Sequence, residues 1–170
     1  LNFASLDYLG LAAHPTVRAA ALAALGQSRL GAAGSSTACL GVTTPVLALE
    51  ARVARFVGLP AAVAFPSGAE AIRATLHGLL RAGDDVIVDM GSHPAMFESV
   101  LAVRARLHRC PVGSLEAIER RLIRLSRQPA RGRLFLALPT VSAFGSRMPD
   151  MVELLALARQ HGATVIADVT

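Results

Sequence analysis

Short apolar runs rich in Val, Ile, Leu and Phe alternate with segments of helical periodicity from residue 61 onward. This alternation is typical of an α/β fold, in which each helix carries the chain back to begin a parallel strand. Most of the runs are continuously apolar, which indicates a mainly parallel sheet covered by helices on both faces. The predicted strands are Ala62–Phe65, Asp85–Asp89, Leu107–Cys110, Leu134–Leu138 and Thr164–Asp168.

The segments between these strands carry apolar residues three and four positions apart, as amphipathic helices do. The predicted helices are Pro15–Leu25, Pro45–Val57, Ala69–Leu80, Ala95–Arg104, Leu115–Arg127 and Pro149–Gln160. Ser114 is a suitable N-cap for the helix that begins at Leu115, and Thr44 for the one that begins at Pro45. Residues Gly31–Gly41 are rich in Gly, Ala, Ser and Thr, which predicts a loop.

A length of 170 residues suffices for one domain with a substantial core and is short for two. The hydrophobic share is 53% before the 14 glycines are counted, whereas soluble domains reach about 45–50% with glycine included. We therefore expect some apolar surface to be covered by something outside this chain. No apolar run approaches the ~20 residues of a membrane-spanning helix, so no span is expected. The chain begins at Leu1 with no leader before it, and we expect a fragment of a longer protein.

All 17 basic residues are arginines, and the net charge is +5. Nine of them lie between Arg104 and Arg133 against only Glu116 and Glu119, a bias that suits nucleic acid. No nucleic-acid motif or aromatic interleaving accompanies the charge, so a solvated helix face is the favoured interpretation and nucleic-acid binding is not expected. The phosphates of CoA leave a modest steering role open for these arginines.

The two cysteines, Cys39 and Cys110, lie far apart in sequence and have no CxxC spacing. This arrangement favours reduced thiols in a cytoplasmic protein over a disulfide framework or a metal site.

A predicted strand ends in the small-residue turn Phe65-Pro66-Ser67-Gly68-Ala69 and leads into a predicted helix. Such a turn offers backbone N–H groups and a positive helix end to a phosphate, and Ser67 can add its hydroxyl. Taken alone, the pattern fits an ordinary turn with a serine N-cap even better.

Two further residues stand at or just beyond the carboxyl ends of predicted strands, where open α/β sheets bind their ligands. The imidazole of His93 could stack on a flat aromatic cofactor, although loop histidines are often merely solvated. Asp168 closes the run from Thr164 and could pair with a pyridinium nitrogen, or it could simply begin a loop.

The amino-terminal segment from Asn2 to Pro15 contains Asp7-Tyr8-Leu9-Gly10-Leu11, and Gly31–Gly41 and Thr43–Glu50 follow it. Together with Ser67-Gly68, Ser92-His93 and Asp168, and in this order, these stretches resemble the α-oxoamine synthases. That pyridoxal 5'-phosphate (PLP) family includes aminooxononanoate synthase, aminoketobutyrate ligase, aminolevulinate synthase and serine palmitoyltransferase. The resemblance covers essentially the whole chain. It implies the large domain of fold type I, the aspartate aminotransferase-like fold, present here in part.

The resemblance also implies roles for single residues. Ser67, Gly68 and Ala69 would hold the PLP phosphate, His93 would stack on the ring as the catalytic histidine, and Asp168 would bind the ring nitrogen. Ser142 is the nearest candidate for a further cofactor contact, with an ambiguity of one residue. The family is dimeric, and its reaction joins an amino acid to an acyl-CoA thioester with loss of carbon dioxide and free CoA. By this comparison, residues 1–40 are an amino-terminal segment with a Gly-rich loop, and residues 41–170 are the PLP-binding domain.

Several positions depart from the family pattern. Thr37 and Val46 replace an Arg and a His, and Ala69 stands where an aromatic residue is usual. The chain contains no lysine, and arginine cannot replace the Schiff-base amine because its guanidinium stays protonated. Two alternatives therefore stay open: a degenerate non-catalytic subunit of the same fold, and another fold type I enzyme such as an aminotransferase or lyase.

Overall fold

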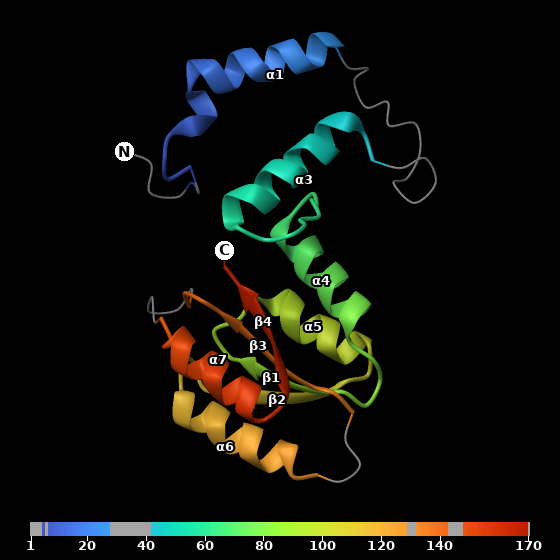
Figure 1. The fold of residues 1–170 in the computed structure, drawn as a ribbon, viewed down its shortest axis with the longest axis vertical. Helices are drawn as coiled ribbons and strands as arrows, with labels where there is room; N and C mark the ends of the chain where they lie inside the picture. Colours follow the sequence, from blue (N-terminus) through green and yellow to red (C-terminus); the bar gives the residue numbers. More distant parts are fainter. Residues whose placement is uncertain (1–4, 6, 28–41, 129–131, 143–147, 170) are drawn as a thin grey trace. The chain divides into compact units, whose positions relative to one another are not determined.

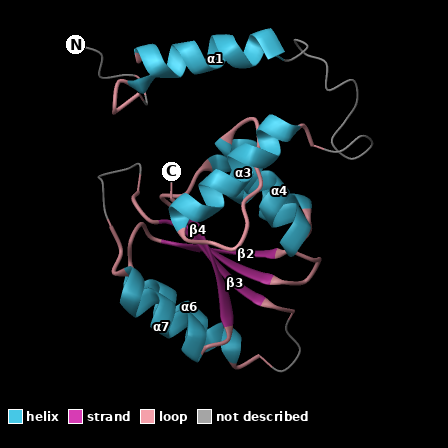
Figure 2. Cartoon of the chain, turned by 45° about the horizontal axis from the view of Figure 1, so that its top comes forward, coloured by secondary structure: helices cyan, strands magenta, loops and turns pink. Residues whose placement is uncertain are grey.

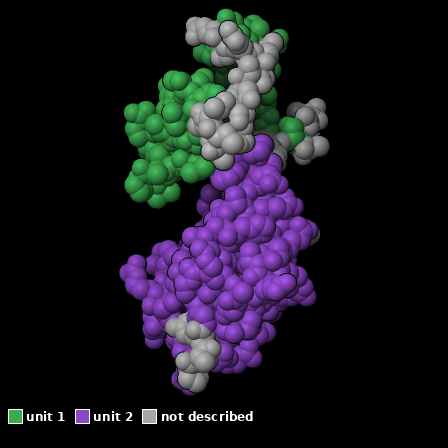
Figure 3. Space-filling model, turned by 90° about the vertical axis from the view of Figure 1, so that its right-hand side faces the viewer, with its two compact units in different colours: residues 1–64 green, residues 65–170 purple. Residues whose placement is uncertain are grey.

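The computed structural model describes residues 5, 7–27, 42–128, 132–142 and 148–169. The chain forms two compact units, residues 1–64 and 65–170 (Figure 3). The predicted division after residue 40 falls at residues 28–41, outside the described part, and stays a prediction. The predicted loop Gly31–Gly41 lies outside it as well.

The second unit contains a four-stranded sheet in which every neighbouring pair of strands is parallel (Figure 1). The strands are β1 (Asp85–Asp89), β2 (Arg106–Cys110), β3 (Leu134–Pro139) and β4 (Ala163–Asp168), in the order β2-β1-β3-β4. Each matches its predicted strand to within one residue. The apolar runs Val86–Val88 and Leu134–Leu138 lie within β1 and β3, which are buried throughout.

Helices cover both faces of this sheet, as predicted (Figure 2). They are α4 (Gly68–Leu79), α5 (Pro94–Ala102), α6 (Leu115–Ser126) and α7 (Met151–Gln160). Successive side chains of a strand point to opposite faces, so β1 divides between two cores. Val86 and Val88 pack in one core with residues of α4 and α5. Ile87 packs in the other with residues of α6 and α7.

Side chains cap the amino-terminal ends of the helices in the second unit. Ser67, His93, Ser114 and Asp150 each accept a backbone N–H of the first turn. The predicted cap at Ser114 is confirmed, with its hydroxyl accepting from Ala117 at 3.3 Å. Such caps satisfy donors that no helical carbonyl reaches. They therefore fix the residue at which each helix begins.

The first unit consists of helices in its described part: a 3-10 turn at Leu11–Ala13, α1 (Pro15–Gln27) and α3 (Thr44–Val57). The α3 N-cap is Thr43, so the predicted cap at Thr44 is one residue too late. The helix ends at Gly58, whose φ of 71° is the left-handed conformation that glycine adopts freely. Of the described helices in either unit, none is long and apolar enough to cross a membrane.

The predicted strand Ala62–Phe65 is wrong. The four strands pair with one another, and none of these described strands pairs with residues 62–65. The backbone N–H of Ala64 instead donates to the Glu50 carboxylate at 2.8 Å. Val63 is 71% exposed. The segment has the composition of a strand, but none of the described strands pairs with it.

Candidate functional site

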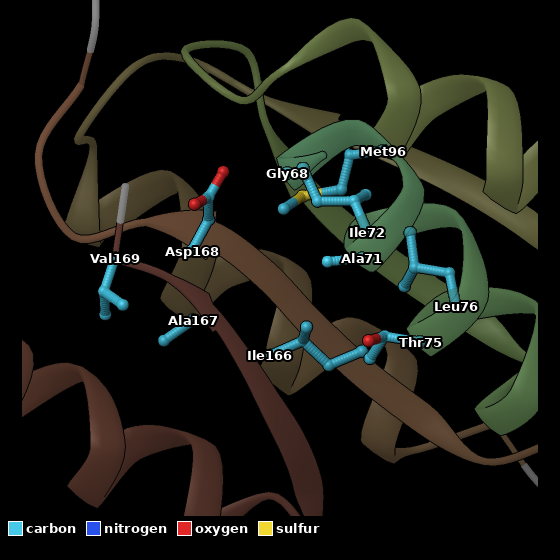
Figure 4. Close-up of a pocket in the computed structure, with 10 residues that line it drawn as sticks. All are labelled: Gly68, Ala71, Ile72, Thr75, Leu76, Met96, Ile166, Ala167, Asp168 and Val169. Atoms are coloured by element: carbon cyan, nitrogen blue, oxygen red, sulfur yellow. The ribbon is translucent and has the colours of Figure 1, made fainter. Parts of the chain in front are cut away.

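A pocket of about 220 Å³ opens at the carboxyl edge of the sheet, beside the amino-terminal end of α4 (Figure 4). One wall comes from α4, another from the last residues of β4 and the residue after them, and Met96 of α5 completes it. The lining residues are Gly68, Ala71, Ile72, Thr75, Leu76, Met96, Ile166, Ala167, Asp168 and Val169. The lining is mostly apolar, with the Asp168 carboxylate, the Thr75 hydroxyl and a helix terminus as polar features, a combination typical of small-molecule sites.

Asp168 is the last residue of β4 and lies opposite Pro139 of β3. Its backbone carbonyl accepts from the N–H of Thr140 at 2.8 Å and from the Thr140 hydroxyl at 3.2 Å. These bonds hold the strand end while the half-buried side chain lines the pocket. The Asp168 carboxylate lies toward the Gly68 end of the pocket, away from Thr75 (Figure 4).

Ser67 and Gly68 form the turn that opens α4. The Ser67 hydroxyl oxygen accepts from the N–H of Glu70 at 3.2 Å, so Ser67 acts as the N-cap. A hydroxyl that accepts one bond still has its own hydrogen to donate. The N–H groups of Gly68 and Ala69 belong to the first turn, where no carbonyl of the helix can accept them. This end of α4 therefore offers donors and positive charge beside the Asp168 carboxylate.

His93 is the N-cap of α5, and its ring Nδ1 accepts from the N–H of Ala95 at 3.1 Å. Because Nδ1 accepts, the neutral ring carries its hydrogen on Nε2. The residue is exposed at the carboxyl edge of the sheet, and Met96, three residues later, lines the pocket. The cap thus sets the direction of the imidazole relative to α5.

Ser142 lies in the segment after β3 and is buried. Its hydroxyl oxygen is 2.5 Å from the point where a Cβ on Gly91 would stand. Gly91 belongs to the loop that leads from β1 to His93. Ser142 therefore packs directly against the His93 loop, and only a residue without a side chain fits between them.

The structure places the described predicted residues at one edge of the sheet, but only some of them line the pocket. Gly68 and Asp168 line the same pocket, while Ser67, Ala69, His93 and Ser142 stand outside that lining among the described residues. Thr37 lies outside the described residues, and Val46 lies half-buried in α3 of the first unit.

Sequence reasoning missed the apolar wall of the pocket. It comes from Ala71, Ile72, Thr75 and Leu76, which recur three and four positions apart on α4. That spacing was the available signal, but on its own it indicates only a buried helix face. These positions line a pocket because a space lies between α4 and the end of β4.

Cys110, at the carboxyl end of β2, is a buried free thiol. Burial raises the pKa of this thiol above its ordinary value. Both its burial and this shift favour a packing role in the core over a reactive one. The other cysteine, Cys39, lies outside the described residues.

All 170 residues match the family model described as aminotransferase class I and II. The chain is 36% identical over 168 residues to the 8-amino-7-oxononanoate synthase of Paracidovorax citrulli, covering 99% of this chain and 40% of the relative. It is 34% identical over 164 residues to the enzyme of the same name from Geobacter sulfurreducens, covering 96% and 41%. The chain thus spans about two fifths of the length of these curated relatives.

Solved structures also superpose on this chain. The serine palmitoyltransferase of Sphingomonas wittichii superposes with a TM-score of 0.85 and 26% identity, over 95% of this chain and 40% of that one. A serine palmitoyltransferase from S. paucimobilis, solved with a bound PLP–myriocin aldimine, gives a TM-score of 0.84 at 26% identity, over 95% and 41%. The 8-amino-7-oxononanoate synthase of Francisella tularensis, at 19% identity and a TM-score of 0.74 over 98% and 44%, shares the fold.

Proposed function

Since the chain belongs to the aminotransferase class I and II family of PLP-dependent enzymes, we propose that it forms the PLP-holding part of an α-oxoamine synthase. Such an enzyme condenses an amino acid with an acyl-CoA and releases carbon dioxide and free CoA. The observation that carries the proposal is the pocket in which the Asp168 carboxylate and the amino-terminal end of α4 meet. The relatives named 8-amino-7-oxononanoate synthase support it. We assign the cofactor to residues 41–170.

The phosphate of PLP is assigned to the start of α4. There Ser67 can donate its hydroxyl hydrogen, and Gly68 and Ala69 can donate backbone N–H groups. The positive end of the helix dipole adds to the attraction for a dianion. Because these donors are fixed by the helix, little ordering is needed when the phosphate binds.

The ring is assigned to the space between α4 and the end of β4. Asp168 would face the ring nitrogen and hold a proton there, since a carboxylate favours the charged form of a neighbouring base. When bound, PLP supplies an electron sink for the carbanion that the condensation requires. We assign the stacking contact to His93 and a further cofactor contact to Ser142, and we retain His93 as the catalytic histidine.

A binding titration tests the assignment of the cofactor. We expect PLP to bind the chain at least about tenfold more tightly than pyridoxal, which lacks the phosphate, because charge-assisted hydrogen bonds are lost. Asp168→Asn keeps the side-chain shape and should weaken PLP binding by about tenfold. Asp150→Asn, at the α7 cap, is the matched control and should leave binding unchanged, since Asn caps as well as Asp. Equal binding of PLP and pyridoxal would refute the phosphate assignment.

The reaction itself is tested on the natural protein that contains this chain. Incubation with an amino acid and an acyl-CoA should release carbon dioxide and free CoA in equal amounts. Transfer of the amino group to a keto acid without carbon dioxide release would favour an aminotransferase, and absence of turnover despite PLP binding would favour a non-catalytic subunit. Nucleic acid is not among the partners we propose.

We also propose a cytoplasmic homodimer. Large apolar side chains of the first unit lie open in the described part: Tyr8 is 84% exposed and Phe56 is 92% exposed. Burial of such side chains against a second copy would remove apolar surface from water. Sedimentation equilibrium at tens of micromolar should give twice the mass of the chain. A monodisperse monomer would contradict the proposal.

A further inference from the structure

We infer that Asp89 is a positioning residue, which fixes the loop that carries His93 by binding it to the loop after the neighbouring strand. Asp89 ends β1 and is 3% exposed. Its Oδ1 accepts from the N–H of Gly91 at 2.6 Å. Its Oδ2 accepts from the N–H of Gly113 at 2.7 Å. Gly91 lies in the β1–α5 loop and Gly113 in the β2–α6 loop, so one carboxylate joins two loops.

The segment after β3 also packs against Gly91. A Cβ on Gly91 would stand 2.5 Å from the Ser142 hydroxyl oxygen, 3.0 Å from Asp89 Oδ1 and 3.1 Å from Val112 Cγ1. Ser142 follows β3, and Val112 precedes Gly113. The segments after β1, β2 and β3 therefore meet at Gly91, and the Asp89 carboxylate supplies the hydrogen bonds between the first two.

The backbone closes the turn around Asp89. Ser92 donates its N–H to the Asp89 carbonyl at 3.0 Å. The Ser92 hydroxyl is buried and has no hydrogen-bond partner among the described residues. A buried polar group without a partner is costly, so the local conformation must be imposed by other contacts. The two N–H bonds to the Asp89 carboxylate are charge-assisted and hence strong enough to do so.

Two separate sets of hydrogen bonds thus position His93. Its bond to Ala95 fixes the ring relative to α5. The bonds of Asp89 fix the preceding residues relative to the sheet, on which Asp168 also stands. The second set acts on the loop directly after β1 and so contributes to the distance between the imidazole and the strand ends. This role rests on the proposed function insofar as His93 contacts PLP.

The test compares Asp89→Ala and Asp89→Asn with Asp150→Ala. Asp150 is the matched control because its carboxylate also accepts two backbone N–H groups, from Val152 and Glu153 at 3.0 Å, but at the start of α7. Amide hydrogen exchange of the whole chain is measured by NMR, together with PLP affinity. Asp89→Ala should speed exchange at Gly91 and Gly113 and weaken PLP binding by about tenfold. Asp89→Asn keeps one acceptor oxygen and should give intermediate values.

Asp150→Ala should speed exchange only at the start of α7 and leave PLP affinity unchanged. Unchanged exchange at Gly91 and Gly113 in a folded Asp89→Ala chain would overturn the inference, as would faster exchange with unchanged PLP affinity. If the unaltered chain binds no PLP, the proposed function fails. The loop-fixing role is then decided by the exchange rates alone. If Asp89→Ala does not fold, Asp89→Asn provides the same comparison.

Discussion

Arg106 lies opposite Asp85 on the adjacent strand, and its guanidinium binds both oxygens of that buried carboxylate. The Nε–Oδ1 distance is 2.8 Å and the Nη2–Oδ2 distance is 2.6 Å. The ring Nε2 of His108 lies 2.8 Å from the same Oδ1. This cluster stands at the amino-terminal edge of the sheet, opposite the pocket. The cluster therefore links β1 to β2 and contributes to the stability of the sheet.

The Asp85 cluster predicts a stability that depends on acidity. The Arg106 guanidinium lowers the pKa of the Asp85 carboxyl below its usual value of 3.8, and His108 adds to the effect. A carboxyl with a lowered folded-state pKa stabilises the fold fully above its unfolded-state pKa and loses that effect as the pH falls through the folded-state value. Asp85→Asn should therefore lower the free energy of unfolding at neutral pH, and its difference from the unaltered chain should shrink below about pH 4. Urea unfolding at several pH values measures this. A constant difference would contradict it.

Two glycine substitutions should have opposite effects. Gly91→Ala places a Cβ 2.5 Å from the Ser142 hydroxyl oxygen at a buried site, which should cost about 1–3 kcal/mol by overpacking. Gly78→Ala adds a methyl group to α4 with no atom within 4 Å, which should gain up to about 1 kcal/mol. Denaturant midpoints measure both. Equal stability of the two variants would show that the loops around Gly91 do not pack as described.

Removing the cap of α4 and, separately, the cap of α6 distinguishes an effect on stability from an effect on PLP binding. Ser67→Ala removes the cap of α4 and Ser114→Ala removes that of α6. Each should cost about 1 kcal/mol of unfolding free energy. Only Ser67→Ala should also weaken PLP binding, because only Ser67 stands at the proposed phosphate site. A loss of affinity in both variants would attribute the effect to general destabilisation.

The chain should not retain PLP covalently. It has no lysine, and arginine provides no amine nucleophile at the aldehyde. After borohydride treatment and dialysis, we expect no stoichiometric adduct mapped to the pocket by mass spectrometry. Such an adduct in the pocket would contradict this account.

The four described strands could be predicted because apolar runs such as Leu134–Leu138 are local signals that few other structures explain. Ala62–Phe65 has a similar composition, but pairing is not local, and the carboxylate of Glu50 takes its backbone N–H instead. Asp168 could be selected as a site residue because it ends such a run. The role of Asp89 could not, since it depends on Gly113, 24 residues later.

The sheet separates the pocket from the core beneath α6 and α7. The pocket residues Ile72, Leu76, Met96 and Ile166 pack with the α4–α5 core, whereas Leu122 and Leu125 of α6 belong to the core of the opposite face. A fluorophore or surface anchor attached at the exposed position Arg124 of α6 would stand behind the full thickness of the sheet. The chain can therefore be labelled or immobilised through α6, on the face of the sheet opposite the pocket.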